Sequence, residues 1–335
     1  MPGSGIFGTF AYGAASAWGV YSVPNHFLTA QSEGFQFEKT IAQEHVLYGQ
    51  LYDRADRRAW VKKGATGSFD LALYDRGLGL LFQNMLGKVV TSGAGPYTQT
   101  FFQGDTTGLS MTVQIGRPMT SNASVQAFSY EGVKVKDWTF DVKTGEFATF
   151  NVTFDAMQED TTQTYAAPSY VASDILSAVN ATLIIGGSVT TSASVASLSG
   201  GASVSLAKEV QIKGTNAIDD ERYYFGSITK QEQLVNGFRA LTGTAVITFN
   251  DLTTVYNAMA ADTPVALSLS VQSANFISGS TYGAVNILIP RLYWDKDAIN
   301  LKGPQLIDQD IAFTALYDNV NTPIQIQYVT LDSAP

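Results

Sequence analysis

Short segments in which apolar and polar residues alternate run along most of the chain. Examples are "GSFDLAL", "LSMTVQIG", "FATFNVTFDAM", "GTAVITF" and "ALSLSVQSA", which are rich in β-branched and aromatic residues. A period of two is typical of half-buried β-strands. Gly, Ser, Asn and Asp separate the segments and mark turns. The pattern therefore predicts a mainly β protein.

Helical spacing occurs in two places. The first, Arg76–Gly87, sets Leu78, Leu81, Phe82 and Met85 on one face and ends on a glycine suited to a C-cap. We interpret this stripe as the core-facing side of a short helix.

The second helical segment is Asp251–Thr263. It carries Leu252, Val255, Tyr256 and Met259 on one face, with Asp251 as a possible N-cap. It is also interpreted as a helix that faces the core.

The strand predicted at Ala65–Asp75 and the helix predicted after it have a counterpart later in the chain. "ATGSFDLALYD" at Ala65–Asp75 aligns with "LTGTAVITFND" at Leu241–Asp251, and a helical segment follows each. The alignment sets Phe69, Leu71 and Leu73 over Ala245, Ile247 and Phe249. Two β-rich halves can align by chance, but the shared Thr-Gly pair, phase and Asp favour a duplication.

Other segments extend this repeat. "FNVTFDAM" at Phe150–Met157 resembles "DIAFTAL" at Asp310–Leu316. We therefore expect two tandem domains, 1–160 with an N-terminal arm and 161–335, joined by a polar linker around 158–174. The Ser-rich segment Ser188–Ser205 fits either a flexible loop or a small-residue strand.

A long charged connection precedes the repeated strand in each half, at Glu44–Gly64 and Thr215–Arg239. Each mixes acids, arginines and aromatic residues. We expect both to project and to contact other protein subunits, because Arg and aromatic residues suit interface hot spots. A solvated loop and a nucleic-acid patch are the alternatives. The candidate contact residues are Arg54, Asp56, Arg57, Arg58, Trp60, Asp220, Arg222, Tyr223 and Arg239.

Composition narrows the function classes. A net charge of −9 disfavours a sequence-specific DNA binder, and the chain has no cysteine for disulfides or thiolate chemistry. Its two histidines lack zinc-site spacing, and no phosphate-binding or nucleophile motif is present. Acidic clusters such as Asp219–Arg222 could hold a cation or stand in solvent. We expect no enzyme, metal or cofactor, and neither a signal peptide nor membrane insertion.

Several of these segments, in their order and spacing, resemble the major tail proteins, or tail tube proteins, of long-tailed siphovirus-type bacteriophages. The matching pieces include "GSFDLALYDRGLGLLFQNMLG", "LSMTVQIGRP", "FSYEGVKVKDWTFDVKTGEFATFNVTFDA", "NGFRALTGTAVITFND" and "DQDIAFTALYD". The N-terminal "FAYGAASAWGVYSV" departs from the family's more charged version of that segment.

The resemblance implies a tube subunit of the virion tail, made in the host cytoplasm. Each domain would be a β-sandwich or barrel with a flanking helix and a long inter-strand loop. Six domains form a ring, so the duplication implies a homotrimer with pseudo-sixfold symmetry. Stacked rings would enclose a channel for genomic DNA, with the tape measure protein inside and the tail terminator and distal tail proteins at the ends.

Alternation assigns the two faces of the repeated strand. Phe69, Leu71 and Leu73 are expected to pack under the helix at Arg76–Gly87, and Ser68, Asp70 and Ala72 to face the channel or another subunit. Two alternatives stay open. One is a monomeric carbohydrate-binding or adhesin-type β-sandwich, and the other is a tube in which only one half is tube-like and six chains form each ring.

Overall fold

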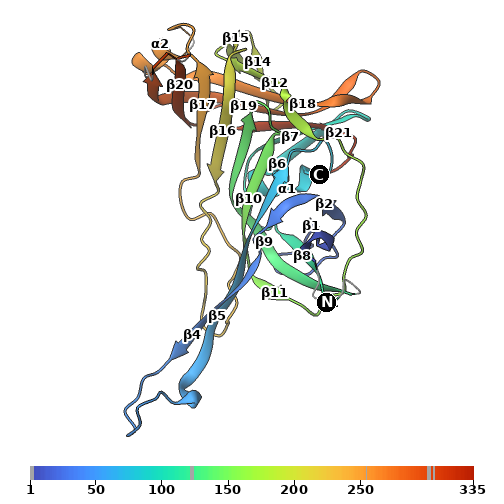
Figure 1. Cartoon of the computed structure of the whole chain (residues 1–335), viewed down its shortest axis with the longest axis vertical. Coiled ribbons are helices and arrows are strands. Elements are labelled where there is room, and N and C mark those ends of the chain that lie inside the picture. Colours follow the sequence, from blue (N-terminus) through green and yellow to red (C-terminus); the bar gives the residue numbers. More distant parts are fainter. Residues whose placement is uncertain (1–3, 121–123, 254, 300–302, 305) are drawn as a thin grey trace.

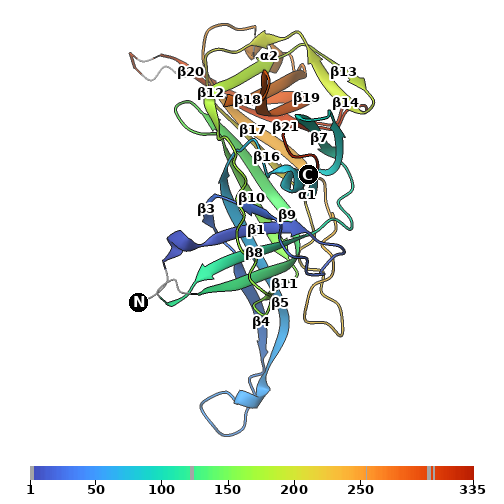
Figure 2. The same ribbon diagram turned by 90° about the vertical axis from the view of Figure 1, so that its right-hand side faces the viewer.

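The protein is an elongated assembly of antiparallel strands from which one long hairpin extends (Figures 1 and 2). The computed structural model describes all residues except 1–3, 121–123, 254, 300–302 and 305. The expectation of a mainly β protein is confirmed. The strands are β1 (Thr9–Ala14), β2 (His26–Leu28), β3 (Ala30–Glu33), β4 (Gln36–Gln43), β5 (Arg58–Ala72), β6 (Gly87–Ser92), β7 (Tyr97–Gln103), β8 (Met111–Pro118), β9 (Val125–Lys143), β10 (Thr149–Ala156), β11 (Gln158–Asp160), β12 (Leu176–Ile185), β13 (Ser188–Ser192), β14 (Val195–Ser199), β15 (Ala202–Ser203), β16 (Ala207–Thr215), β17 (Ala240–Thr248), β18 (Val265–Ser278), β19 (Thr281–Ile299), β20 (Asp308–Ala315) and β21 (Gln325–Thr330), and the helices are α1 (Gly79–Leu86) and α2 (Tyr256–Ala260).

One continuous sheet, here called the inner sheet, runs through both halves of the chain. Its order is β3/β4, β5, β10, β9, β16, β17, β20 and β19, and every neighbouring pair is antiparallel. The halves meet where β16 pairs with β9, from Glu209 opposite Lys143 to Thr215 opposite Asp137. Both halves therefore share one hydrogen-bonded ladder.

A second layer covers one face of the inner sheet. In the first half it is formed by β2, β1, β8 and the start of β9, and in the second half by β15, β12, β18 and the start of β19. The rings of Phe10, Phe35 and Phe154 surround Phe69 between the layers, at centroid distances of 6.1, 5.2 and 5.4 Å. Phe69 thus packs in the core between the layers.

The two halves repeat the same strand order with the same irregularities. The ladder of β3 with β5 shifts between Ala30 and Ser32, and that of β16 with β17 shifts between Ala207 and Glu209. Likewise one extra residue, Lys136 in β9 and Asp295 in β19, is left out of the pairing with β10 and β20. β-Bulges are specific features of a ladder, so their recurrence supports the alignment drawn from the sequence.

Helix α1 confirms the first helical prediction. Its stripe of Leu78, Leu81, Phe82 and Met85 is fully buried. The Phe82 ring lies 5.4 Å from that of Phe150 in the inner sheet. Gly87 ends the helix with φ 99° and its N–H donates to the Gln83 carbonyl, a conformation that favours glycine.

The second helical prediction is wrong in extent. Only Tyr256–Ala260 is α-helix. Asp251 does not cap this helix. Its carboxylate accepts hydrogen bonds from the backbone N–H and hydroxyl of Thr253, at 2.7 and 2.8 Å. Such local bonds compete with a helical start. Part of the expected apolar face is consequently open, with Leu252 49% exposed.

The Ser-rich segment adopts the strand alternative in part. β13 and β14 form a hairpin whose turn residues Ala193 and Ser194 have positive φ. The Ala196 backbone N–H donates to the Gln325 side chain at 2.8 Å, which fastens the hairpin to β21.

The halves also interlock at a second place. The C-terminal strand β21 pairs with β19 on one side and with β7 of the first half on the other. Arg76 and Asp332 add an ion pair of 2.8 Å. The segment 161–174 that joins the halves contains no strand, in keeping with a linker there, although the division into two domains stays a prediction.

The repeated Thr-Gly pair has a packing reason. A Cβ at Gly67 would lie 2.4 Å from the Phe35 ring, and a Cβ at Gly243 would lie 2.3 Å from the Phe313 ring. Both distances are too short for any side chain, since close-packed cores do not yield that much space. In each half the glycine leaves room for an aromatic ring against the inner sheet.

We predict that Gly243→Val lowers the free energy of unfolding by about 2 kcal/mol or more, because the added atoms overlap the Phe313 ring and force the core apart. The neighbouring Thr244 is exposed, so Thr244→Val is the matched control and changes stability by less than ~0.5 kcal/mol. Urea unfolding measures both. Equal losses in the two variants would contradict the packing explanation.

Candidate functional site

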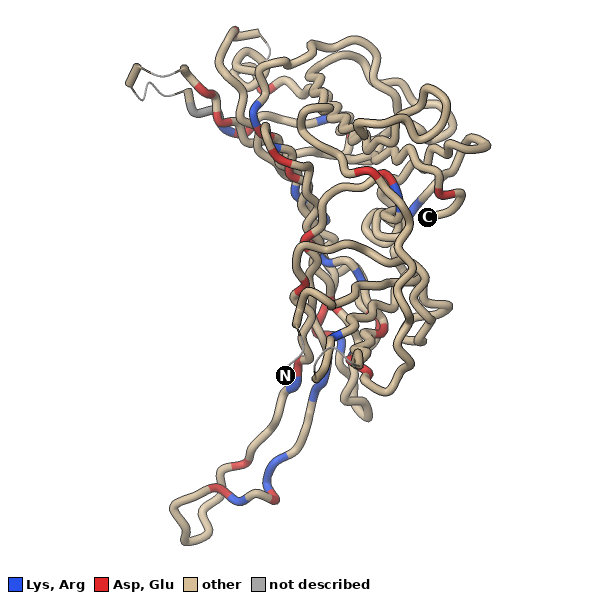
Figure 3. Tube along the Cα trace, turned by 45° about the vertical axis from the view of Figure 1, so that its right-hand side comes forward, with Lys and Arg blue, Asp and Glu red and all other residues tan. Residues whose placement is uncertain are grey.

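The face of the inner sheet opposite the core is polar along its whole length. It presents partly or fully exposed residues from both halves, in which carboxylates outnumber lysines: Ser68, Asp70, Asp137, Thr139, Asp141, Lys143, Asn151, Thr153, Glu209, Gln211, Lys213, Thr242, Thr244, Lys296, Asp310 and Thr314. Figure 3 shows acidic and basic residues interspersed along these strands, on the concave side of the molecule. We call this surface the polar face.

The predicted channel-facing residues lie at one end of the polar face. Ser68 and Asp70 are partly exposed, and Asp70 accepts a hydrogen bond from Ser32. Ala72 is only 1% exposed. Its side chain is therefore not open to solvent in this chain, because the alternation of burial ends where β5 passes into the core.

The first long connection is the loop and one side of a strand hairpin. Strands β4 and β5 extend it to Gln43 and from Arg58, so that only 44–57 lack strand structure. Figure 1 shows this hairpin, here called the arm, reaching well beyond the rest of the chain. The expected projection is observed for this connection.

The predicted residues of the arm are open to solvent. Arg57 and Arg58 are exposed, and Trp60 is 53% exposed with Lys39 over its ring. Arg54 and Asp56 form an ion pair of 2.6 Å, and hydrogen bonding from Arg54 lowers the pKa of Asp56. An exposed pair of this kind stabilises the chain little, so these charges are available to a partner.

Apolar residues at the arm tip were missed by the sequence reasoning. Leu47 and Leu51 are fully exposed, and Tyr52 is 83% exposed. The sequence signal was present in "HVLYGQLYD", where apolar residues occur in a connection without a strand partner. Clustered exposed apolar side chains mark interaction sites in soluble proteins.

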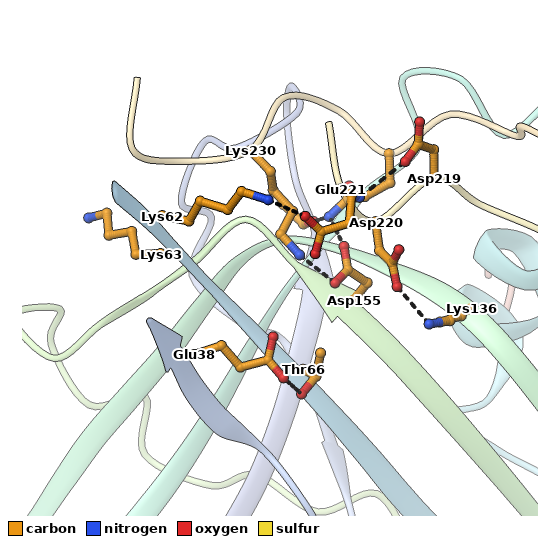
Figure 4. A network of polar contacts seen from close by, with 12 residues as sticks. Glu38, Lys62, Lys63, Thr66, Lys136, Asp155, Asp219, Asp220, Glu221 and Lys230 are labelled. Atoms are coloured by element: carbon orange, nitrogen blue, oxygen red, sulfur yellow. Dashed lines mark hydrogen bonds and ion pairs between the residues drawn. The ribbon is translucent and has the colours of Figure 1, made fainter. Parts of the chain in front are cut away.

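The second long connection does not project, and the prediction that it does is wrong. Residues 216–239 lie against the first half of the same chain, where the Lys63 backbone N–H donates to the Ile228 carbonyl at 2.7 Å. Figure 4 shows the resulting polar network. Asp220 pairs with Lys136 at 2.7 Å, and the Tyr223 hydroxyl donates to the Lys63 carbonyl.

The two predicted arginines of this connection are also engaged within the chain. Arg239 donates to the Gly104 carbonyl at 2.9 Å, and burial lowers its pKa. Arg222 donates to the Glu232 carbonyl and to the Tyr224 hydroxyl. Asp220, Tyr223 and Arg239 thus bind the first half of their own chain, whereas Arg222 bonds within the connection itself.

A buried ion pair fastens this connection. Lys230 Nζ lies 2.6 Å from Asp155 Oδ1, with the side chains 3% and 1% exposed. The Gln233 amide donates to the other Asp155 oxygen at 2.7 Å. Burial raises the pKa of Asp155 to about 6, and Lys230 and Gln233 oppose that rise. Sequence reasoning missed these residues because they lie far apart in the chain.

Within the described part of the chain, no group of three or more His, Cys, Asp and Glu residues is placed to hold a metal ion. No helix formed by the described residues is long and apolar enough to cross a membrane.

We predict that Lys230→Met destabilises the protein in a pH-dependent way. Without the cation, the pKa of Asp155 rises further above its unfolded-state value. Stability is therefore lost as the pH rises through that pKa, because the ionised carboxylate is then buried unpaired. Urea unfolding is expected to show a loss of ~3 kcal/mol or more at pH 8 and a clearly smaller loss at pH 5.

Lys62→Met is the matched control. Lys62 pairs with Glu221 nearby, but the two side chains are 40% and 69% exposed, so the loss stays below ~1 kcal/mol at both pH values. A pH-independent loss in Lys230→Met would show that Asp155 does not carry the effect.

The comparisons with known proteins agree with the resemblance seen in the sequence. No curated protein matches the chain significantly. The family model described as phage tail tube protein matches residues 8–315, which include the inner sheet, the arm and the docked connection. The chain therefore belongs to the phage tail tube protein family.

Proposed function

We propose that this protein is the structural, non-enzymatic tube subunit of a siphovirus-type phage tail, in which three copies close a ring with pseudo-sixfold symmetry. Rings stack into a tube of the virion tail, and genomic DNA passes through the channel without sequence-specific binding. The tape measure protein inside and the terminator and distal tail proteins at the ends are the further partners proposed.

The observation that carries this proposal is the pairing of β9 with β16. It joins two halves of the same strand order edge to edge in one sheet. A head-to-tail contact of this kind yields a closed ring when the rotation between units closes. Two units per chain then make three chains per ring, and the inner sheets together form a barrel wide enough for an aqueous channel.

The polar face suits the lining of such a channel. Its excess of carboxylates repels phosphate over a Debye length of ~8 Å, and a passing duplex is not trapped. Asp70 corresponds to Val246 in the second half. Asp70 lies between Ser32 and Asn151 on the neighbouring strands. Val246 lies between two carboxylates, Glu209 and Asp310. Both halves therefore bring carboxylates to this row.

The arm suits contacts between stacked rings. It extends beyond the rest of the chain and ends in exposed apolar and charged residues (Figure 1). Residues Leu47, Leu51, Arg57 and Arg58 on the arm are the proposed contacts.

Negative-stain electron microscopy of the purified protein tests the proposal. Stacked rings with a central hole and three chains in each ring are expected. Six chains in each ring would contradict the trimer, and a compact monomer that binds glycans would favour the surface-adhesin alternative.

Variants of the arm test its part in stacking. Leu47→Ser/Leu51→Ser is expected to leave the thermal midpoint unchanged, because both side chains are fully exposed, and to leave single rings in place of tubes. Arg57→Glu/Arg58→Glu tests the charged part of the arm. Normal tubes from both double variants would exclude the arm from ring stacking.

A further inference from the structure

We infer that the ring closes when the free edge of β19 in one copy pairs antiparallel with the free edge of β3–β4 in the next copy, with Lys296 opposite Glu38. This inference rests on the proposed function and adds to it the two strands, their register and the residues in contact.

Both strands are edges of the inner sheet. Within the described residues, β3 and β4 pair only with β5, and the part of β19 from Tyr293 to Ile299 pairs only with β20. An edge of unpaired N–H and C=O groups is a template for another strand. The two edges lie at opposite ends of the inner sheet, as a head-to-tail ring requires.

The register follows from the junction inside the chain. Gly64 in β5 and Ala240 in β17 each stand two residues before the Thr-Gly pair of their half. Glu38 lies opposite Gly64, and Thr215 lies opposite Ala240. Strand β3–β4 is thus the counterpart of β16.

On the other side, β19 is the counterpart of β9. Lys296 follows the bulge at Asp295 as Asp137 follows the bulge at Lys136. Within the chain Thr215 lies opposite Asp137. The same arrangement between copies sets Glu38 opposite Lys296.

The backbone groups have the required direction. The Gly34 N–H donates to the Ser68 carbonyl in β5, so alternate residues, Phe37 and Lys39 among them, direct their groups away from β5. Within the chain the Asn216 N–H donates to the Lys136 carbonyl at 2.9 Å. Its counterpart between copies is a bond from Lys39 N–H to the Asp295 carbonyl.

The charges fit this register. In the derived register Glu38 faces Lys296. A slip of one residue would set Glu38 opposite Asp295 in one direction and Lys39 opposite Lys296 in the other. Opposite charges on facing strand positions stabilise a pair and like charges destabilise it, so the derived register is favoured over both neighbours.

A side-chain clamp marks the same edge. The clamp consists of the side chains of Glu33 and Arg117, which form an ion pair of 3.0 Å. The Glu33 carboxylate accepts a hydrogen bond from the Phe35 N–H at 2.8 Å, and Arg117 donates to the Phe35 carbonyl at 2.9 Å. In the second half the counterpart of Phe35 is Ile212, which pairs with Phe140 of β9.

The clamp thus occupies, at the free edge, the place that a strand fills at the internal junction. Side chains that satisfy edge groups are a known protection against unwanted pairing. The printed bonds of the clamp reach only the backbone of Phe35, and the outward groups of Phe37 and Lys39 lie beyond it, where the inferred contact with β19 lies.

The absence of native cysteines permits a direct test. Glu38 and Lys296 form a non-hydrogen-bonded pair in the inferred register, with Cα atoms about 4.5 Å apart, within disulfide range. Glu38→Cys/Lys296→Cys protein oxidised during assembly is expected to give covalent dimers and trimers, and no larger species, on a non-reducing gel.

Gln36→Cys/Lys296→Cys is the matched control, since its positions are diagonal by two residues and lie beyond easy disulfide reach. Charge reversal gives a second measurement. Glu38→Lys slows ring formation roughly 2- to 5-fold, and Glu38→Lys/Lys296→Glu restores it.

Microscopy of the unmodified protein separates the two proposals. Rings without the specific cross-link and without charge rescue would overturn this junction and leave the proposed function intact. Absence of rings from the unmodified protein would overturn the proposed function itself. Equal cross-linking of the control pair would overturn the register.

Discussion

The structure depends on one constraint, the need of backbone groups at a sheet edge for partners. Within the chain this need is met where β16 pairs with β9, which converts two similar halves into one inner sheet. The long strands β9 and β19 each enter both layers, so that the ladder and the core between the layers are coupled. Rings such as Phe69 and Phe154 are buried between the two layers. Their burial stabilises the ladder, because the inner sheet cannot separate from the second layer without exposing them.

The two long connections show how one position in a fold can serve two purposes. The connection of the second half lies on the first half and is held by the buried pair of Lys230 and Asp155. The connection of the first half continues as a hairpin with exposed apolar residues at its tip. One connection thus fastens the two halves together, and the other is left open to solvent.

Opposite requirements meet on the two faces of the inner sheet. One face needs close packing, and Gly67 and Gly243 admit aromatic rings there. The other face carries polar and charged residues that are partly or fully exposed. Strand alternation reconciles the two, since neighbouring residues serve different faces.

The sequence by itself determined the features that depend on local order. Alternation revealed the strands, the stripe from Leu78 to Met85 revealed α1, and the Thr-Gly pairs revealed the correspondence of the halves. These signals are local because strand and helix periods, and the absence of a Cβ, act over a few residues.

Only the tertiary structure decided what depends on residues far apart in the chain. It joined Asp155 to Lys230, laid 216–239 on the first half, buried Ala72 and left Leu47 exposed. It also shortened α2, where Asp251 bonds to Thr253 and does not cap the helix. The physical reason is that burial and ion pairing depend on which distant segments come into contact, and a single sequence does not specify these contacts.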